Sequence, residues 1–457
     1  MRATLHEIKQ AVSHMWMQGD ALFEGVSTDS RSLETGNIFV ALRGERIDAH
    51  RFLPDVAQKG AAAAVAEQIP AGFSLPCLCV PDSRIALGEM ARFWRQAFSM
   101  PVIAVTGSNG KTTVKEMIAC ILHDALGENY LATEGNLNND IGVPQTLFRL
   151  KKNHRLAVLE LGMNHVGEIA YLVQMSQPTV GLVNNAQREH QEFMGSVQAV
   201  AEENGQVIRM LPTDGIAVFP AEDAFSGLWQ QYAQEEGKRK VITFGTSHDA
   251  TVRGNYTQQN GKTELTVRIE DITFSVSLSV IGAHHVHNAL AAIACCYGVG
   301  IAPEVIARGL ARFLPVAGRM QYKTAANGAV LIDDTYNANP DSVLAAIDVL
   351  ADMASPRYLI LGDMGEVGVE GARFHEEVGT YARNKGIEHF YALGELSRHA
   401  ARAYGPPARH YDRMQALTDT LHEEIPPVAT VLVKGSRFMK MEQVIARLQT
   451  GGSTSTQ

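Results

Sequence analysis

The sequence predicts an α/β protein of three domains: a small α/β domain, a central domain built on a parallel sheet with an antiparallel appendage, and a C-terminal Rossmann-like α/β domain. With 457 residues the chain exceeds what one hydrophobic core usually holds. Apolar strand-like runs alternate with stretches long enough for crossover helices, which is typical of a parallel sheet covered on both faces. Between Thr251 and Ile281 apolar and polar residues alternate, which indicates antiparallel strands.

The first domain is predicted over residues 1–82, where short strands and turns predominate. NIFVALRG (Asn37–Gly44) predicts a strand, and DVAQKGAAAAVAE (Asp55–Glu67) predicts a helix because alanine favours helices. The next stretch, SRIALGEMARFWRQAF, has helical periodicity and leads into the central domain.

The central domain is predicted over residues 83–314. Its strands include LAVLELG (Leu156–Gly162), TVGLVNNA (Thr179–Ala186) and GIAVFP (Gly215–Pro220), and a buried helix, HNALAAIACCYG, follows the antiparallel strands. The third domain is predicted over residues 315–457. Four strand-then-loop units between AVLIDDTYNANP and ATVLVKGS are typical of a dinucleotide-type fold, without its G-x-G-x-x-G fingerprint. The polar tail TGGSTSTQ is expected to fray.

Composition limits the possible functions. Hydrophobic residues make up 46% of the chain, with no apolar run near the roughly 18 residues of a membrane span. The start, MRATLHEIKQ, lacks the apolar segment of a secretion signal, so a cytoplasmic protein with five reduced core thiols is expected. A net charge of −9 without a basic run argues against a nucleic-acid partner. We expect a monomer that acts on small molecules.

A phosphate-binding loop is predicted within Val102–Ile118, where an apolar strand runs through TGSNGKTT into a helix. In such a loop backbone N–H groups turn onto phosphate oxygens, Lys111 reaches the β- and γ-phosphates, and the Thr112 hydroxyl is placed to hold Mg²⁺. A chance Gly/Ser turn is the alternative, but the flanking strand and helix are what the motif requires. The predicted phosphate contacts are Gly107, Ser108, Asn109, Gly110, Lys111, Thr112 and Thr113.

Two further residues follow predicted strands. Glu160 closes LAVLELG, and a carboxylate at the carboxyl end of a parallel strand points into the ligand crevice, where it could hold Mg²⁺ beside Thr112; the alternative is a solvent-facing charge. His190 follows TVGLVNNA with Glu189 and Glu192 close by, and is either a surface residue or a metal or phosphate ligand. We assign Lys111, Glu160 and His190 as candidate catalytic residues, and Thr112, Glu160 and His190 as candidate metal ligands.

Two polar segments are candidates for ligand binding. TEGNLNNDIGVP, between two predicted helices, offers amide donors and acceptors through Asn136, Asn138 and Asn139, unless it is simply a loop. GAHHVHNALAA carries three histidines at a helix start, but no cysteine or water-activating glutamate accompanies them as zinc chemistry would require. A helix whose Asn288 amide reads the edge of a base is the favoured interpretation.

Polar residues also end three strands of the third domain, so they should converge on one edge. Lys434 and Arg437 would bind a carboxylate, and the Asp and Asn side chains an amine or a ribose. This pattern predicts an active site between domains. The substrate-binding candidates here are Asp334, Tyr336, Asn337, Asn339, Lys434 and Arg437.

These motifs together resemble the Mur ligase family, the ATP-dependent amide-bond-forming enzymes of peptidoglycan precursor synthesis. TGSNGKTT, TEGNLNNDIGVP, LELGMNHVGEI, GAHHVHNALAA, AGRMQ, DDTYNANPDS, LGDMGEVG and VLVKGSR occur in the family's order across nearly the whole chain. The resemblance implies ATP and Mg²⁺ as cofactors, with Asn288, Arg319 and Asp333 as further nucleotide contacts.

The resemblance also implies the substrates. GVSTDSR and ALRGERIDAHRF resemble a uridine-binding first domain, and YNANP, without a D-N-P-R motif, resembles the member that adds D-alanyl-D-alanine. The implied partners are therefore UDP-N-acetylmuramoyl-tripeptide, D-alanyl-D-alanine and ATP. A folylpolyglutamate synthetase and a nucleotide-binding switch remain alternatives. The implied contacts to the UDP end are Ser27, Asp29, Ser30, Arg31, Asp48 and His50.

One position departs from the family pattern. Where relatives usually carry a lysine that becomes carbamoylated and supports a second Mg²⁺, this chain has Asn204. Either His190 and Glu160 hold that ion with fewer protein charges, or a neighbour such as Glu203 substitutes.

Overall fold

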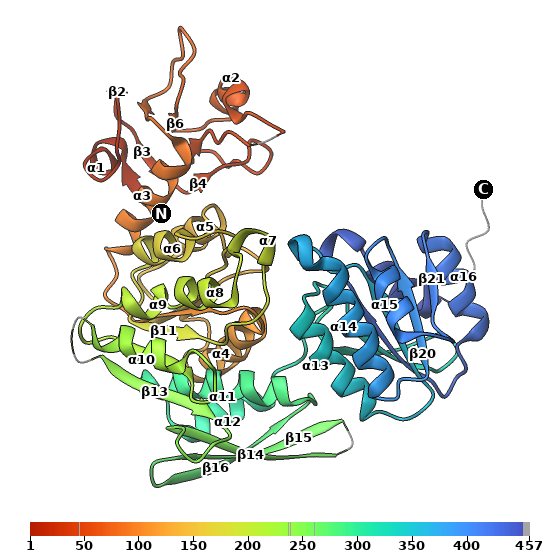
Figure 1. Ribbon diagram of the computed structural model, residues 1–457. Helices are drawn as coiled ribbons and strands as arrows, with labels where there is room; N and C mark the ends of the chain where they lie inside the picture. Colours follow the sequence, from red (N-terminus) through yellow and green to blue (C-terminus); the bar gives the residue numbers. More distant parts are fainter. Residues whose placement is uncertain (45, 236, 238, 260, 451–457) are drawn as a thin grey trace.

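The computed structural model describes residues 1–44, 46–235, 237, 239–259 and 261–450. Within these residues the strands form a two-stranded, a five-stranded, a nine-stranded and a six-stranded sheet, and Figure 1 shows the sheets in successive parts of the molecule. Residues 451–457 of the tail that was expected to fray lie outside the described residues.

The first part of the chain carries the two small sheets. The five-stranded sheet has the order β2-β7-β6-β5-β4, and β1 pairs with β3. Its elements are β1 (Arg2–Thr4), α1 (Leu5–Lys9), β2 (Trp16–Gln18), β3 (Leu22–Glu24), β4 (Val26–Ser27), β5 (Ile38–Val40), η1 (Ala49–Phe52), α2 (Leu53–Gln58), β6 (Ala63–Ala66) and β7 (Cys77–Cys79).

The helix expected over Asp55–Glu67 is wrong in its second half. Helix α2 ends at Gln58, Gly60 takes a left-handed φ of +86°, and Ala63–Ala66 forms the central strand β6. Strand β6 pairs in parallel with both β5 and β7 and is completely buried. Small side chains fit between packed layers, so pairing on both sides overrides the helix propensity of alanine.

The central part is a nine-stranded sheet in the order β16-β15-β14-β13-β12-β11-β8-β10-β9. It is parallel from β9 to β14, and α3 leads into it as expected. Its elements are α3 (Ser83–Arg95), β8 (Val102–Thr106), α4 (Lys111–Leu126), β9 (Tyr130–Ala132), α5 (Gly142–Phe148), β10 (Leu156–Glu160), α6 (Glu168–Ser176), β11 (Val180–Val183), α7 (Gln191–Met194), α8 (Val197–Asn204), α9 (Gln206–Arg209), β12 (Ile216–Pro220), α10 (Ser226–Gln234), β13 (Lys240–Gly245), β14 (Val252–Gln259), β15 (Lys262–Ile269), β16 (Ile272–Leu278), α11 (Ala283–Gly298) and α12 (Pro303–Ala311).

Helices cover both faces of this sheet. Successive side chains of a strand point to opposite faces, so each strand contributes to two hydrophobic clusters. Val102 and Ala104 of β8 pack in one hydrophobic cluster with α3, α5, α6 and α8 to α10. Ile103 and Val105 pack in the other cluster with α4, α11 and α12. The antiparallel strands β14 to β16 continue the same sheet, because β14 pairs in parallel with β13. The predicted appendage is therefore an extension of the central sheet.

The third part is a six-stranded sheet in the order β17-β18-β22-β19-β20-β21, antiparallel only at β17. The four predicted strands correspond to β18, β19, β20 and β22. Its elements are β17 (Gln321–Thr324), β18 (Val330–Asp334), α13 (Pro340–Ala351), β19 (Arg357–Gly362), η2 (Gly368–Glu370), α14 (Gly371–Asn384), β20 (His389–Leu393), α15 (Ser397–Tyr404), β21 (Arg409–Tyr411), α16 (Met414–Glu424), β22 (Thr430–Lys434), η3 (Arg437–Met439) and α17 (Glu442–Thr450).

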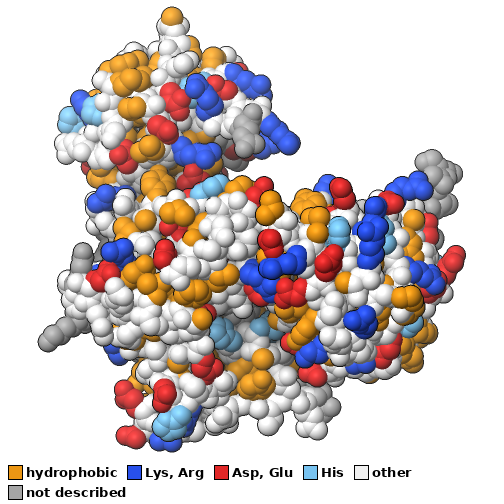
Figure 2. Space-filling model, in the orientation of Figure 1, with side chains coloured by type: hydrophobic (Ala, Val, Ile, Leu, Met, Phe, Trp, Pro, Cys, Tyr) orange, Lys and Arg blue, Asp and Glu red, His pale blue; other side chains and the backbone are white. Residues whose placement is uncertain are grey.

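Figure 2 shows the three parts as distinct lobes, with charged side chains gathered where the central and third parts meet. The predicted fold class is confirmed: an α/β chain with a small first part, a parallel central sheet and a Rossmann-like third part. Among the described residues no helix is both long and apolar enough to cross a bilayer.

Candidate active site

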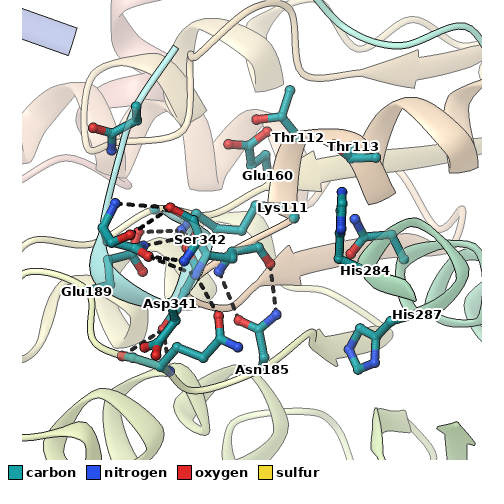
Figure 3. A pocket seen from close by; sticks show the side chains of 18 of the residues that line it. Lys111, Thr112, Thr113, Glu160, Asn185, Glu189, His284, His287, Asp341 and Ser342 are labelled. Atoms are coloured by element: carbon teal, nitrogen blue, oxygen red, sulfur yellow. Dashed lines mark hydrogen bonds and ion pairs between the residues drawn. The ribbon is translucent and has the colours of Figure 1, made fainter. Parts of the chain in front are cut away.

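A cavity of about 1680 Å³ lies between the central and third parts (Figure 3). Its walls are the phosphate-binding loop, the ends of β10 and β11, the start of α11 and the loops that follow β18 and β22. The predicted site residues that line it are Ser108, Asn109, Gly110, Lys111, Thr112, Thr113, Asn138, Asn139, Glu160, His190, Asn288, Arg319, Asp334, Tyr336, Asn337, Asn339 and Lys434. The predicted interdomain position of the site is thus supported by one continuous cavity.

The loop between β8 and α4 has the backbone of a phosphate cradle. Gly107 and Gly110 have φ of +130° and +84°, a region that favours glycine. A Cβ at Gly110 would lie 2.3 Å from Asn288 Oδ1, so only glycine lets the loop and α11 approach this closely. Helix α4 then begins at Lys111 and directs its N-terminal end at the cavity.

The Lys111 amine is folded back onto the loop. Its Nζ donates to Gly107 O at 2.5 Å and Ser108 O at 3.1 Å, and lies 2.9 Å from Glu189 Oε1 (Figure 3). The Lys111 side chain is 15% exposed and that of Glu189 is 11% exposed. The Lys111 amine therefore lies beside the loop, where an anionic ligand would meet it.

Glu160 has one carboxylate oxygen without a partner. Its Oε1 accepts from Asn138 Nδ2 at 2.8 Å, whereas the buried Oε2 has none. Thr112 lines the same cavity. Carboxylate and hydroxyl oxygens suit Mg²⁺, and no trio of His, Cys, Asp or Glu among the described residues is arranged to hold a metal alone. The residues therefore fit an ion that takes its other ligands from phosphate and water.

His190 lies between two carboxylates. Its Nδ1 is 2.5 Å from Glu366 Oε2 in the third part, and its Nε2 is 3.4 Å from Glu189 Oε1. Burial alone would lower the pKa of His190, but hydrogen bonds to Glu189 and Glu366 raise it to about 9. The ring is thus an imidazolium, and a metal-binding role would require it to lose a proton.

Asn204 forms hydrogen bonds with the start of the phosphate loop. Its Oδ1 accepts from Thr106 Oγ1 at 2.6 Å and from the Gly107 N–H at 3.2 Å. An amide cannot be carbamoylated, so this side chain serves as a support of the loop. Glu203 is engaged elsewhere, because its Oε1 accepts from the Ile169 N–H at the start of α6. Neither Asn204 nor Glu203 lines the cavity.

The three histidines of α11 are uncharged. Burial lowers the pKa of His284 to about 4, and it lowers the pKa values of His285 and His287 as well. Both ring nitrogens of His285 are buried without a partner, while His287 Nε2 bonds to Asn184 O at 2.8 Å. Neutral rings facing the cavity suit an uncharged ligand group better than a phosphate.

Asn288 is next to the phosphate loop. Its Oδ1 accepts from Asn184 Nδ2 at 2.9 Å, and the same Nδ2 donates to Asn109 O. The Asn288 carbonyl oxygen accepts this bond with one of its two lone pairs, and no hydrogen bond of its amide N–H groups is seen among the described residues, so those groups are free for the predicted contact with a base. The segment TEGNLNNDIGVP begins after β9 and ends in α5, so it links a strand to a helix and not two helices.

The third part contributes a buried lysine and an arginine. Lys434 Nζ lies 2.5 Å from Asp334 Oδ2 and donates to Asn337 O at 2.9 Å. Arg319 stacks its guanidinium 4.2 Å from the centre of the Tyr336 ring, and its buried Nε has no partner. Both side chains line the cavity opposite the phosphate loop, and the charge of Lys434 is balanced there by Asp334.

Several predicted residues lie outside the cavity lining. Arg437 is mostly exposed and pairs with Glu442, and Asp333 pairs with Lys323 at 2.6 Å. Each is held within the third part. The remaining predicted residues outside the lining are Ser27, Asp29, Ser30, Arg31, Asp48, His50, Gly107 and Asn136.

The residues predicted to contact the UDP end form hydrogen bonds mainly with one another. Asp29 accepts both Nε and Nη2 of Arg31, and His50 Nδ1 lies 2.6 Å from Asp48 Oδ1. Ser27 Oγ donates to Asp29 O. They form an ordered polar corner of the first part, separate from the cavity.

One arginine joins the central part to the third. Arg188, in the loop after β11, donates to both carboxylate oxygens of Asp341 at the start of α13, and to Glu377 of α14 at 2.7 Å. Asn109 of the phosphate loop and Asn339 also exchange amide hydrogen bonds. Arg188 could not be recognised from the sequence, because nothing near it in the chain indicates partners more than 150 residues away.

We expect Arg188→Ala to loosen this junction. A hydrogen bond to a charged group contributes about 1.5–3 kcal/mol, and the truncation removes several. Small-angle X-ray scattering should therefore record a larger radius of gyration for the variant. Arg209→Ala is the matched control, because the Arg209–Glu235 pair at 2.7 Å lies within the central part. Equal radii for Arg188→Ala and the wild type would contradict the prediction.

Comparison with known proteins places this architecture in a family. The model described as Mur ligase middle domain matches residues 105–296, and that described as Mur ligase, glutamate ligase domain matches residues 318–437. The chain belongs to the Mur ligase family. Within it, UDP-N-acetylmuramoyl-tripeptide--D-alanyl-D-alanine ligase of Escherichia coli (strain K12) is 40% identical over 455 residues, covering 98% of this chain and 99% of that protein.

Solved structures agree over the whole chain. MurF from Acinetobacter baumannii has a TM-score of 0.91 at 31% identity and covers 98% of this chain and 99% of its own. MurF ligase from Thermotoga maritima, in complex with ADP, has a TM-score of 0.84 at 26% identity, covering 94% and 97%. Folylpolyglutamate synthase of Mycobacterium tuberculosis has a TM-score of 0.62 at 15% identity over 82% of this chain and 96% of its own, which shows a shared fold alone.

Proposed function

We propose that this chain is an ATP-dependent ligase that joins D-alanyl-D-alanine to UDP-N-acetylmuramoyl-tripeptide in cytoplasmic peptidoglycan precursor synthesis. The observation that carries the proposal is the single cavity in which a phosphate-binding loop faces Lys434 and Arg319 of another lobe. A simple nucleotide switch needs no such second wall. The full-length likeness to ligases of that name supports this choice over a folylpolyglutamate synthetase.

The reaction begins with activation of a carboxylate. A carboxylate oxygen of the tripeptide takes the γ-phosphoryl group of ATP, ADP leaves, and the amine of D-alanyl-D-alanine then displaces inorganic phosphate from the acyl phosphate. Lys111 and the N-terminus of α4 would offset charge on the phosphoryl group, so positioning and electrostatics supply most of the rate. Mg²⁺ held by Thr112 and Glu160 would add further positive charge at the phosphates.

Each part has a proposed task. Residues 1–82 bind the UDP end through the Asp29–Arg31 and Asp48–His50 corner, residues 83–314 bind ATP, and residues 315–457 bind the dipeptide. The Lys434 ammonium, which is buried in that wall beside Asp334, would attract the dipeptide carboxylate. We propose a monomer that acts on small molecules, because the central and third parts of the same chain supply both walls of the cavity.

The proposal predicts that ADP release requires both the UDP-tripeptide and the dipeptide. A coupled assay with purified protein should record a steady rate only when both are present with ATP and Mg²⁺, and mass spectrometry should find the amide product. If ADP were released at an equal rate without either acceptor, the chain would be a nucleotide hydrolase and the ligase proposal would be wrong.

A further inference from the structure

Two carboxylates bracket the phosphate-binding loop. Strand β8, which carries the loop, lies between β10 and β11 in the sheet. Glu160 ends β10, and Glu189 follows β11. Figure 3 shows both reaching toward the space around Lys111 from different elements.

Glu189 shares an unusual feature with Glu160: one of its oxygens is buried without a partner. Glu189 Oε1 contacts Lys111 Nζ and His190 Nε2, at 2.9 Å and 3.4 Å, whereas Oε2 has no partner and the residue lines the cavity. An unpaired buried carboxylate oxygen costs free energy, so native proteins usually keep one only where something binds to it. The ligand must be a cation or a donor.

We propose that Glu189 ligates a divalent cation at the phosphate loop, separate from the ion at Glu160. Asp and Glu oxygens are the usual protein ligands of Mg²⁺. The cation would complete its shell with nucleotide phosphate oxygens and water, because no three-residue cluster of metal-binding side chains exists among the described residues.

The neighbouring charges show how nucleotide and cation would enter together. Positive and negative side chains alternate in a row of four residues, Lys111, Glu189, His190 and Glu366. In this row Lys111 forms an ion pair with Glu189. Phosphates compete for the Lys111 ammonium, and as it turns to them the Glu189 carboxylate loses its counterion. A divalent cation bound to those phosphates would then replace the Lys111 ammonium as the counterion of Glu189. Cation binding at Glu189 should therefore depend on nucleotide.

Mn²⁺ titration tests this inference, which rests on the proposed use of ATP. Loss of the free Mn²⁺ signal in electron paramagnetic resonance measures bound ion in the presence of a non-hydrolysable ATP analogue. We expect Glu189→Gln to weaken one class of bound Mn²⁺ at least about tenfold, as loss of metal-site partners does. Glu160→Gln should weaken a different class, and the double variant both. Glu192→Gln, an exposed change in the same segment, should match the wild type.

The alternative is that Glu189 only balances the charge of Lys111. In that case Glu189→Gln would leave the Mn²⁺ titration unchanged and tighten binding of the metal-free nucleotide, and the inference would be overturned. If Glu189→Gln does not fold, Glu189→Asp keeps the charge on a shorter side chain and should still weaken Mn²⁺. A wild type that binds no nucleotide would instead refute the proposed function, so the two failures are distinguishable.

Discussion

Replacing Lys111 with alanine is expected to abolish ligation while the fold persists. Lys111 is the first residue of α4 and belongs to none of the hydrophobic clusters, and its ammonium would meet the phosphoryl group as charge moves to the leaving oxygen. Removing one preorganised group of this kind lowers kcat by about 10²–10³. Steady-state assays at saturating ATP measure the loss. A variant that keeps more than a tenth of wild-type turnover would show that Lys111 does not neutralise phosphate charge.

The control for this variant follows from the structure. Lys111→Ala removes the ion-pair partner of the buried Glu189 carboxylate. The variant should therefore lose free energy of folding as well as activity. Thermal unfolding followed by circular dichroism, compared with Lys111→Ala/Glu189→Gln, separates the two effects. Lys385→Ala removes an exposed lysine paired with Asp348 in the third part, and should leave turnover unchanged.

Glu160→Gln is expected to raise the Mg²⁺ requirement of the reaction at least about tenfold. Glutamine retains the shape and the oxygen that accepts from Asn138, but replaces the unpartnered Oε2 by an amide that cannot ligate a cation. The rate measured against Mg²⁺ concentration at fixed ATP reports the shift. Glu134→Gln, an exposed change paired with Arg149, is the control. An unchanged Mg²⁺ curve for Glu160→Gln would rule out the ligand role.

Much of the central part could be predicted from the chain alone, because the signals there are local. The apolar runs of β8, β10 and β11, each closed by a polar or glycine residue, fix both the strands and the edge at which Lys111 and Glu160 meet. The helix prediction for Ala63–Ala66 is wrong because this strand depends on pairing with the neighbouring strands β5 and β7 on both sides. Composition within the segment carries no trace of that pairing.

The site residues divide in the same way. Lys111, Thr112 and Glu160 follow from a motif and a strand end, and the structure brings them into one cavity. Arg437 also follows a strand, yet the chain turns there into η3 and Arg437 pairs with Glu442. Glu189 is marked only by an oxygen left without a partner, and that property exists only in three dimensions.

The division of the cavity between two sheets has a consequence for descent with modification. One continuous sheet carries the phosphate loop, Glu160 and α11, while the loops after β18 and β22 supply the opposite wall from a separate hydrophobic core. Under the proposed division of tasks, substitutions in those loops would alter the acceptor without disturbing nucleotide use. After duplication of such a gene, both copies would keep the activation of a carboxylate by ATP. A new acceptor preference would then require substitutions in the third part only.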